Sequence, residues 1–232
     1  MHETLHSPDS FRAILPVAIA VEETDEDVSE SELFIEEKAQ AVDAVRSRRR
    51  EFATVRFCAR QALGQLGYPP VPILSGRRRE PIWPDGIVGS MTHCDGYRAA
   101  AVASKADMAA VGIDAEINEP LPVEVADLIM SENEAQAIRY LVSSEPYVAW
   151  DRLLFSIKES IFKTWFPLTE SWLDFTQCEV SIEASTFAGH LRIPAPAFNG
   201  IDLSCIRGRW TVCRRHLLTA ALVVASDGLE ER

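Results

Sequence analysis

A stripe of large apolar residues in the second half of the chain constrains the fold more than any other feature. Its members are Trp150, Leu154, Ile157, Ile161 and Trp165. They step by four, three, four and four residues, which aligns them on one buried face of an α-helix. We expect this helix to run from about Pro146 to Phe166, with Pro167 ending it. The residues expected on the other side of the helix are Arg152, Ser156, Glu159 and Lys163.

Two further stretches favour helices, and one favours loop. Residues 31–66 contain no proline and no glycine before Gly64, which predicts one helix. A capping box at Ser131, with Glu134 three residues later, opens a shorter helix through about residue 142. Residues 68–90 are interrupted by many prolines and glycines, so we expect loop with short extended pieces.

The rest of the chain favours strands. Residues 97–104 and 111–117 predict two strands joined by a turn, and residues 175–226 are strand-like. Turns are expected near Gly189, residues 194–200 and Gly208. The segment 98–104 resembles 219–226, which hints at two related halves meeting near 110–125. The sequence therefore predicts an α+β fold.

Composition excludes several classes of protein. The 232 residues carry a net charge of −12, which argues against a general nucleic-acid binder. The longest apolar runs are far shorter than the roughly 18 residues that cross a bilayer. The N-terminus shows no basic segment followed by an apolar core, so no secretory signal is predicted. Five scattered cysteines form no CxxC pair and suit a reducing compartment, and we expect a cytoplasmic protein without a membrane partner.

Charge is unevenly distributed along the chain. Residues 22–37 hold nine acids and no base, whereas residues 46–60 hold six arginines and one acid. A second basic cluster follows at Arg77, Arg78 and Arg79. Arginine binds phosphate well, so local clusters in an acidic protein indicate a confined anion site. Solvated surface charge is the alternative interpretation.

Two carboxylates stand out in the strand VGIDAEI. Residues two apart in a strand point to the same side, so Gly112, Asp114 and Glu116 share one face. Paired carboxylates repel each other and need a cation or basic partners. Two oxygen ligands on one strand suit Mg²⁺ bound together with phosphate oxygens. An edge strand with a polar face shows the same pattern.

The apolar-striped helix and the loop before residue 97 add candidate groups. Glu159 and Lys163 form an i,i+4 pair in the favourable orientation, a pattern also common on exposed helices. His93 lies in a glycine-rich stretch and is either a structural histidine or a cation beside phosphate. No GxxxxGK, GxGxxG, HExxH or GxSxG motif is present.

Taken together, these segments resemble the 4′-phosphopantetheinyl transferases, in the enterobactin-synthesis branch and most like its actinobacterial members. The resemblance spans roughly residues 46–165. The matching motifs, in order, are Trp83-Pro84, Gly89-Ser90, Thr92-His93, Gly96-Tyr97, Gly112-Ile113-Asp114-Ala115-Glu116 and Lys158-Glu159-Ser160-Ile161-Phe162-Lys163. The pattern Arg79-Glu80-Pro81 also belongs to it.

The resemblance implies an enzyme that moves 4′-phosphopantetheine from coenzyme A to a serine of an apo carrier protein, releasing 3′,5′-ADP. It implies that Asp114, Glu116 and Glu159 hold Mg²⁺, with Mn²⁺ as the other candidate. Glu159 would also take the serine proton, and Lys163 would stabilise the leaving group. Asp114, Glu159 and Lys163 are therefore the expected catalytic residues.

By the same resemblance, a set of polar residues binds coenzyme A. The members are Arg48, Arg56, Gly76, Arg77, Arg78, Thr92, His93, Lys158 and Lys163. The sequence does not decide which arginine of 77–79 makes the contact. The family's two α+β subdomains are related by a pseudo-twofold axis with coenzyme A between them, which divides this chain into 1–112 and 113–232.

The expected partners are coenzyme A and apo acyl or peptidyl carrier domains, with no nucleic acid and no membrane. A chain that already contains both halves need not dimerise, so we expect a monomer. Two other functions use the same residues: a magnesium phosphohydrolase acting on coenzyme A, and a non-catalytic coenzyme A-binding module. The ordered motifs favour the transferase over both.

Overall fold

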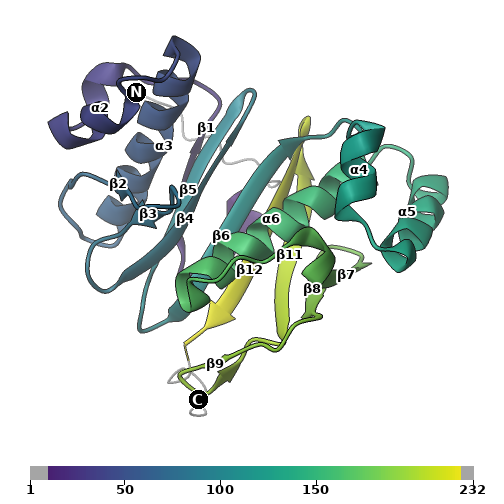
Figure 1. The fold of residues 1–232 in the computed structure, drawn as a ribbon. Coiled ribbons are helices and arrows are strands. Elements are labelled where there is room, and N and C mark those ends of the chain that lie inside the picture. The colour runs from purple at the N-terminus through teal and green to yellow at the C-terminus, as the bar shows by residue number, and fades with distance from the viewer. Residues whose placement is uncertain (1–9, 226–232) are drawn as a thin grey trace.

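The computed structural model describes residues 10–225 and shows an α+β protein built from two halves (Figure 1). Each half packs one 20-residue helix against an antiparallel sheet, so the fold class predicted from the sequence is confirmed. The N-terminal nine residues, where no secretory signal is predicted, lie outside the described part of the chain, as do residues 226–232. None of the helices between residues 10 and 225 has the length and apolar character that a membrane crossing requires.

The first half is organised around helix α3 (Arg46–Gln65), which covers one face of a three-stranded sheet. In spatial order its strands are β1 (Ala20–Thr24), β5 (Tyr97–Ser104) and β4 (Ile87–Cys94). The remaining elements of this half are α1 (Phe11–Ile14), η1 (Glu30–Glu32), α2 (Ile35–Ala41), β2 (Leu74–Ser75) and β3 (Pro81–Ile82). Strand β5 has the bounds that the sequence predicts.

The second half is organised around helix α6 (Trp150–Thr169), which lies against a five-stranded sheet (Figure 1). In spatial order the strands are β6 (Met108–Ile117), β12 (His216–Val224), β11 (Cys205–Cys213), β8 (Thr186–Leu191) and β7 (Cys178–Glu183). The other elements are α4 (Val123–Ile129), α5 (Glu132–Ser144), η2 (Phe175–Gln177), β9 (Ala197–Phe198) and β10 (Ile201–Asp202). Every member of the predicted apolar stripe is at most 3% exposed.

The two sheets meet where β4 runs beside β6. No backbone ladder joins these strands among the described residues. Instead, the Ser90 hydroxyl accepts the Ile113 N–H at 3.1 Å, and the Thr92 hydroxyl accepts the Ala115 N–H at 3.0 Å. Side chains of the first half therefore hold the edge strand of the second half, and Asp114 lies at the seam. The predicted boundary at 112/113 falls inside β6, and this division of the chain stays a prediction.

The single helix predicted for residues 31–66 is wrong, because the chain turns between α2 and α3. The turn brings the buried Glu37 to Arg60, with 2.8 Å between Glu37 Oε1 and Arg60 Nη1. In one continuous helix these residues would lie roughly 35 Å apart. Glu37 also accepts the N–H groups of Phe34 and Ile73, so a buried polar network sets the break.

Other details of the secondary structure also differ from the sequence prediction. Strand β4 begins at Ile87, inside the stretch predicted as loop. Helix α6 begins after Pro146 and continues two residues past Pro167, to Thr169, where the Glu170 N–H bonds the Phe166 carbonyl. A proline removes only one hydrogen bond this close to a helix end. Gly189 and Gly208 lie inside β8 and β11 rather than at turns, because each glycine leaves room for a neighbouring side chain.

Candidate active site

Gly112 allows helix α6 to approach strand β6 closely. A Cβ atom at this position would lie 2.1 Å from the Ser160 carbonyl oxygen and 2.4 Å from the Thr164 hydroxyl. The absence of a side chain therefore sets the distance between the strand that carries Asp114 and the helix that carries Lys163. This close packing explains why the motif at 112–116 begins with a glycine.

Asp114 is the most highly connected carboxylate of the site. Lys163 Nζ donates to its Oδ1 at 2.8 Å, and Ser156 Oγ donates to its Oδ2 at 2.8 Å. Thr92 Oγ1 donates a longer bond of 3.3 Å to Oδ1. The Asp114 side chain is only 8% exposed, so these donors hold a nearly buried carboxylate in one orientation.

Glu116 lies two residues further along the same face of β6, as predicted. Arg152 Nη1 donates to its Oε2 at 3.1 Å. Burial raises the pKa of Glu116, and the charge of Asp114 raises it further, whereas Arg152 lowers it. The basic partner required by two neighbouring carboxylates is therefore supplied from α6.

Glu159 lies on α6, one turn before Lys163, and is half-buried in the wall of a large cleft. Burial raises the pKa of Glu159, Lys163 lowers it, and the charges of Asp114 and Glu116 raise it. The three carboxylates thus lie near enough to oppose one another's ionisation. This is the electrostatic setting in which a bound cation is favoured.

The donor chemistry at this seam fits a hard divalent cation. Asp114, Glu116 and Glu159 offer only carboxylate oxygens, the ligand type that Mg²⁺ takes. Within residues 10–225, however, no three His, Cys, Asp or Glu side chains gather closely enough to hold a metal ion. Arg152 and Lys163 instead neutralise the two strand carboxylates. The three carboxylates therefore have the ligand chemistry that Mg²⁺ requires, but their side chains are not arranged around one common site in this structure.

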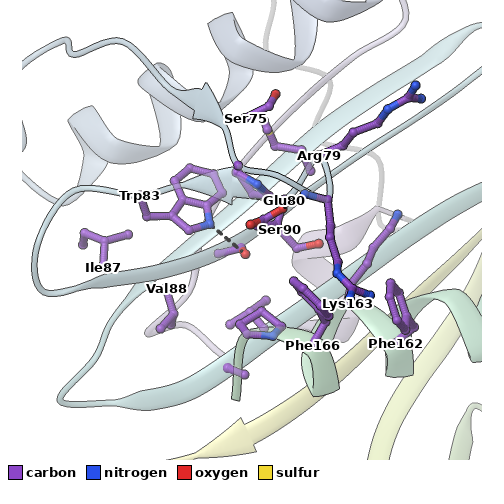
Figure 2. A pocket seen from close by; sticks show the side chains of 18 of the residues that line it. Ser75, Arg79, Glu80, Trp83, Ile87, Val88, Ser90, Phe162, Lys163 and Phe166 are labelled. Atoms are coloured by element: carbon purple, nitrogen blue, oxygen red, sulfur yellow. Dashed lines mark hydrogen bonds between the residues drawn. The ribbon is translucent and has the colours of Figure 1, made fainter. Parts of the chain in front are cut away.

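The cleft has a volume of about 1520 Å³ and lies between the two halves. Figure 2 shows Ser75, Arg79 and Glu80 on one side and the α6 residues Phe162, Lys163 and Phe166 on the other. Trp83 closes one end, where its indole N–H donates to the Gly89 carbonyl at 3.0 Å (Figure 2). A cleft of this size accommodates a ligand larger than most drug-sized molecules.

Basic residues from the first half line the cleft. Arg77, Arg78 and Arg79 are exposed between β2 and β3, and Arg78 reaches across so that its Cζ lies 5.8 Å from the Phe166 ring centroid. Gly76 also lines the cleft, and the Glu80 carboxylate packs where its side chain would be. Arg48 Nη1 bonds Glu51 at 2.8 Å and remains 58% exposed.

Arg56 differs from these arginines because it is 3% exposed. It donates to the Ile73 carbonyl and the Ser75 hydroxyl, both at 2.9 Å. Burial lowers its pKa to about 10. Arg56 lines the cleft, yet its guanidinium also holds the backbone that leads into the arginine cluster.

Two residues predicted to bind coenzyme A, Lys158 and Thr92, do not line the cleft, and their binding role stays a prediction. Lys158 is 3% exposed, and its ammonium donates to Glu134, the Ile129 carbonyl and the Phe175 carbonyl at 2.7 to 2.8 Å. All three of its N–H groups are therefore used inside the protein. Thr92 is also buried, and its hydroxyl serves Asp114 and β6.

The sequence analysis missed two groups that the fold brings to the site. Ser156, expected on the exposed side of α6, is fully buried against β12, where its hydroxyl lies 2.9 Å from that of Thr219. Glu51 lies among Arg48, His93 and Arg98. The sequence around Glu51 and Ser156 gives no sign of these contacts, because the contacts join segments that are far apart in the chain.

A basic cleft beside a cluster of carboxylates, between two α+β halves, is typical of proteins that bind a phosphorylated ligand with a divalent cation. Comparison with known families agrees. The model described as 4′-phosphopantetheinyl transferase N-terminal domain matches residues 36–103. The model described as 4′-phosphopantetheinyl transferase superfamily matches residues 110–205. The chain belongs to the 4′-phosphopantetheinyl transferase superfamily.

Individual relatives are similar over most of the chain. 4′-Phosphopantetheinyl transferase Svp of Streptomyces mobaraensis is 50% identical over 86% of this chain and 82% of the relative. PptT of Mycobacterium tuberculosis is 43% identical over 81% of this chain and 85% of the relative. Npt of Nocardia iowensis is 39% identical over 90% of this chain and 98% of the relative. The resemblance stated from the motifs is confirmed, and the chain is an enzyme of this family.

Proposed function

We propose that this chain transfers 4′-phosphopantetheine from coenzyme A to a serine hydroxyl of apo acyl or peptidyl carrier domains, releasing 3′,5′-ADP. One observation carries the proposal: Lys163 pairs with Asp114 at 2.8 Å, and Glu159 lies one turn earlier on the same helix, beside a basic cleft. This arrangement combines a proton acceptor, a cation and an anion-binding surface, which phosphoryl transfer requires.

Asp114, Glu116 and Glu159 are the residues that would hold Mg²⁺, or Mn²⁺, against the pyrophosphate. When bound, the ion would neutralise charge that builds up on the phosphoryl oxygens. The mutual repulsion of the three carboxylates supports this assignment. Arg152 and Lys163 would have to leave the two strand carboxylates, and the phosphates of coenzyme A offer both cations a new partner.

Glu159 is the group that would take the proton from the carrier serine. As the proton leaves, the serine oxygen bonds to the phosphorus that bears the pantetheine arm, and the bond from that phosphorus to 3′,5′-ADP breaks. Burial raises the pKa of Glu159 when no ion is bound, and a bound cation would lower it, so its role as proton acceptor is supported by its place in the cleft wall one turn before Lys163. Lys163 would stabilise the charge left on the departing 3′,5′-ADP.

The phosphates of coenzyme A would bind to the basic wall of the first half. Arg48 and His93, together with Arg77 or Arg78 and the Gly76 backbone, line the cleft and support this role. Arg56 would act partly through the 73–75 backbone that it holds. Carriers of polyketide, nonribosomal peptide, siderophore and fatty-acid synthesis all present the modified serine, and we propose a cytoplasmic monomer that serves such carriers.

The intact mass of a purified apo carrier, incubated with this protein, coenzyme A and Mg²⁺, tests the proposal. Transfer adds about 340 Da to the carrier, and both a chelator and Glu159→Ala should abolish the gain. Hydrolysis of coenzyme A without any gain would favour a phosphohydrolase instead. Intact coenzyme A and unmodified carriers would favour a binding module.

A further inference from the structure

Glu51 is an acidic side chain at the basic end of the cleft. It lies on α3, lines the cleft, and its side chain is 20% exposed. Its Oε2 accepts a bond from Arg48 Nη1 at 2.8 Å and lies 3.5 Å from His93 Nδ1. A carboxylate placed where an anion should bind requires an explanation, because it repels phosphate unless it organises the cations around it.

A buried arginine, Arg98, lies next to Glu51. Arg98 lies directly opposite His93 in the β4–β5 register, and its side chain is 8% exposed. Arg98 Nη2 lies 4.0 Å from Glu51 Oε1, and Arg98 Nε lies 2.9 Å from Asp27 Oδ1. Arg98 Nη1 also donates to the Cys94 carbonyl at 3.1 Å. Asp27, Arg98 and Glu51 thus form a row of alternating charge that ends at His93 and Arg48.

We propose that Glu51 is a positioning residue that orients His93 and Arg48 toward the 3′-phosphate of coenzyme A. This inference rests on the proposed function and names a residue through which the coenzyme A site is built. With Glu51 Oε2 at 3.5 Å from Nδ1, the carboxylate favours a proton on that nitrogen, which leaves Nε2 as the nitrogen available to the ligand. One bond from Arg48 to Glu51 leaves the other guanidinium donors available to phosphate.

The charges around His93 predict how this arrangement responds to pH. Burial lowers the pKa of His93, and the cations of Arg48 on α3, Lys163 on α6 and Arg98 on β5 lower it further. Glu51 acts in the opposite direction and raises it. Removing the Glu51 charge should therefore confine the doubly protonated imidazole, which donates from both nitrogens, to a lower pH range.

Isothermal titration of coenzyme A and of dephospho-coenzyme A, without metal or carrier, tests the inference between pH 5.5 and 8.5. The second ligand lacks the 3′-phosphate and reports on the rest of the site. Glu51→Gln should weaken coenzyme A binding about tenfold, while its effect on dephospho-coenzyme A stays within about twofold. The fall of coenzyme A affinity with rising pH should begin at lower pH than in the wild type.

Three controls separate positioning from damage to the fold. Glu51→Asp keeps the carboxylate and should retain part of the affinity. Glu124→Gln changes an exposed glutamate on α4 and should bind both ligands as the wild type does. In a His93→Ala background, Glu51→Gln should weaken coenzyme A binding much less, because residues that act together are not additive.

Several outcomes would overturn the inference. One is a Glu51→Gln protein that binds coenzyme A as tightly as the wild type, or more tightly, across the pH range. Another is an equal loss for both ligands. Failure of the proposed function looks different, because the wild type would then leave the mass of apo carriers unchanged whatever the two ligands show in titration.

Discussion

Replacing Gly112 with alanine tests whether the approach of α6 to β6 builds the site. The new Cβ would lie 2.1 Å from the Ser160 carbonyl oxygen and 2.8 Å from the Thr164 amide nitrogen. A carbon–oxygen contact needs about 3.3 Å, so helix and strand must separate by roughly 1 Å. Both neighbours are helix backbone, so no side-chain rotation relieves the clash.

The separation stretches the contacts that join the two elements. Lys163 Nζ now lies 2.8 Å from Asp114 Oδ1, and Ser156 Oγ lies 2.8 Å from Asp114 Oδ2. An added 1 Å takes both outside hydrogen-bond range. Because Asp114 and Glu159 lie on these two elements, the separation also displaces one carboxylate from the other, and misplacement on that scale reduces turnover about 100-fold. Overpacking of this kind also destabilises the fold by about 1–3 kcal/mol.

The assay pairs the initial rate of carrier modification with urea unfolding. Gly112→Ala should lower kcat/KM about 100-fold while most of the protein remains folded. Gly64→Ala is the matched control, because its Cβ meets nothing within 4 Å in the exposed part of α3. That variant should be about 0.5–1 kcal/mol more stable and fully active. A Gly112→Ala enzyme with near wild-type kcat/KM would refute the reasoning.

Three further predictions follow from the buried groups. Lys158→Met leaves the Glu134 carboxylate buried without its cation, so urea unfolding should show a loss of about 3–5 kcal/mol. Because the pKa of Glu159 is raised, folding favours its protonated form and stability falls as pH rises through the range above its usual value. Glu159→Gln should therefore raise the Tm at pH 7 while abolishing transfer, and an unchanged Tm would contradict this. Ser156→Ala removes a donor to Asp114, and single-turnover rates should fall about tenfold with coenzyme A affinity retained.

Local patterns predicted much of the second half of the molecule. The stripe from Trp150 to Trp165 is buried as its helical spacing requires. The alternation in VGIDAEI places Ile113 and Ala115 in the core and leaves the acidic side chains on the other face. Both features depend only on the periodicity of a helix or a strand.

Patterns within a single helix or strand gave wrong expectations where a second element packs over its apparently exposed face. Ser156 lies opposite the apolar stripe, yet β12 buries it beside Thr219. Lys158 belongs to the same motif as Glu159, but it points toward Glu134 and the end of α4 rather than into the cleft. One-dimensional spacing contains no information on which element packs against the second face of a helix.

The sequence by itself determined the α+β class, the apolar and polar faces of α6 and β6, and the motifs that define the family. Only the tertiary structure decided that α2 folds back to bring Glu37 to Arg60, and that Glu51 lies beside His93. The physical reason is the separation along the sequence over which each kind of contact acts. Periodicity acts between residues a few positions apart, whereas these contacts join segments separated by tens of residues, and only the packing of the whole chain brings them together.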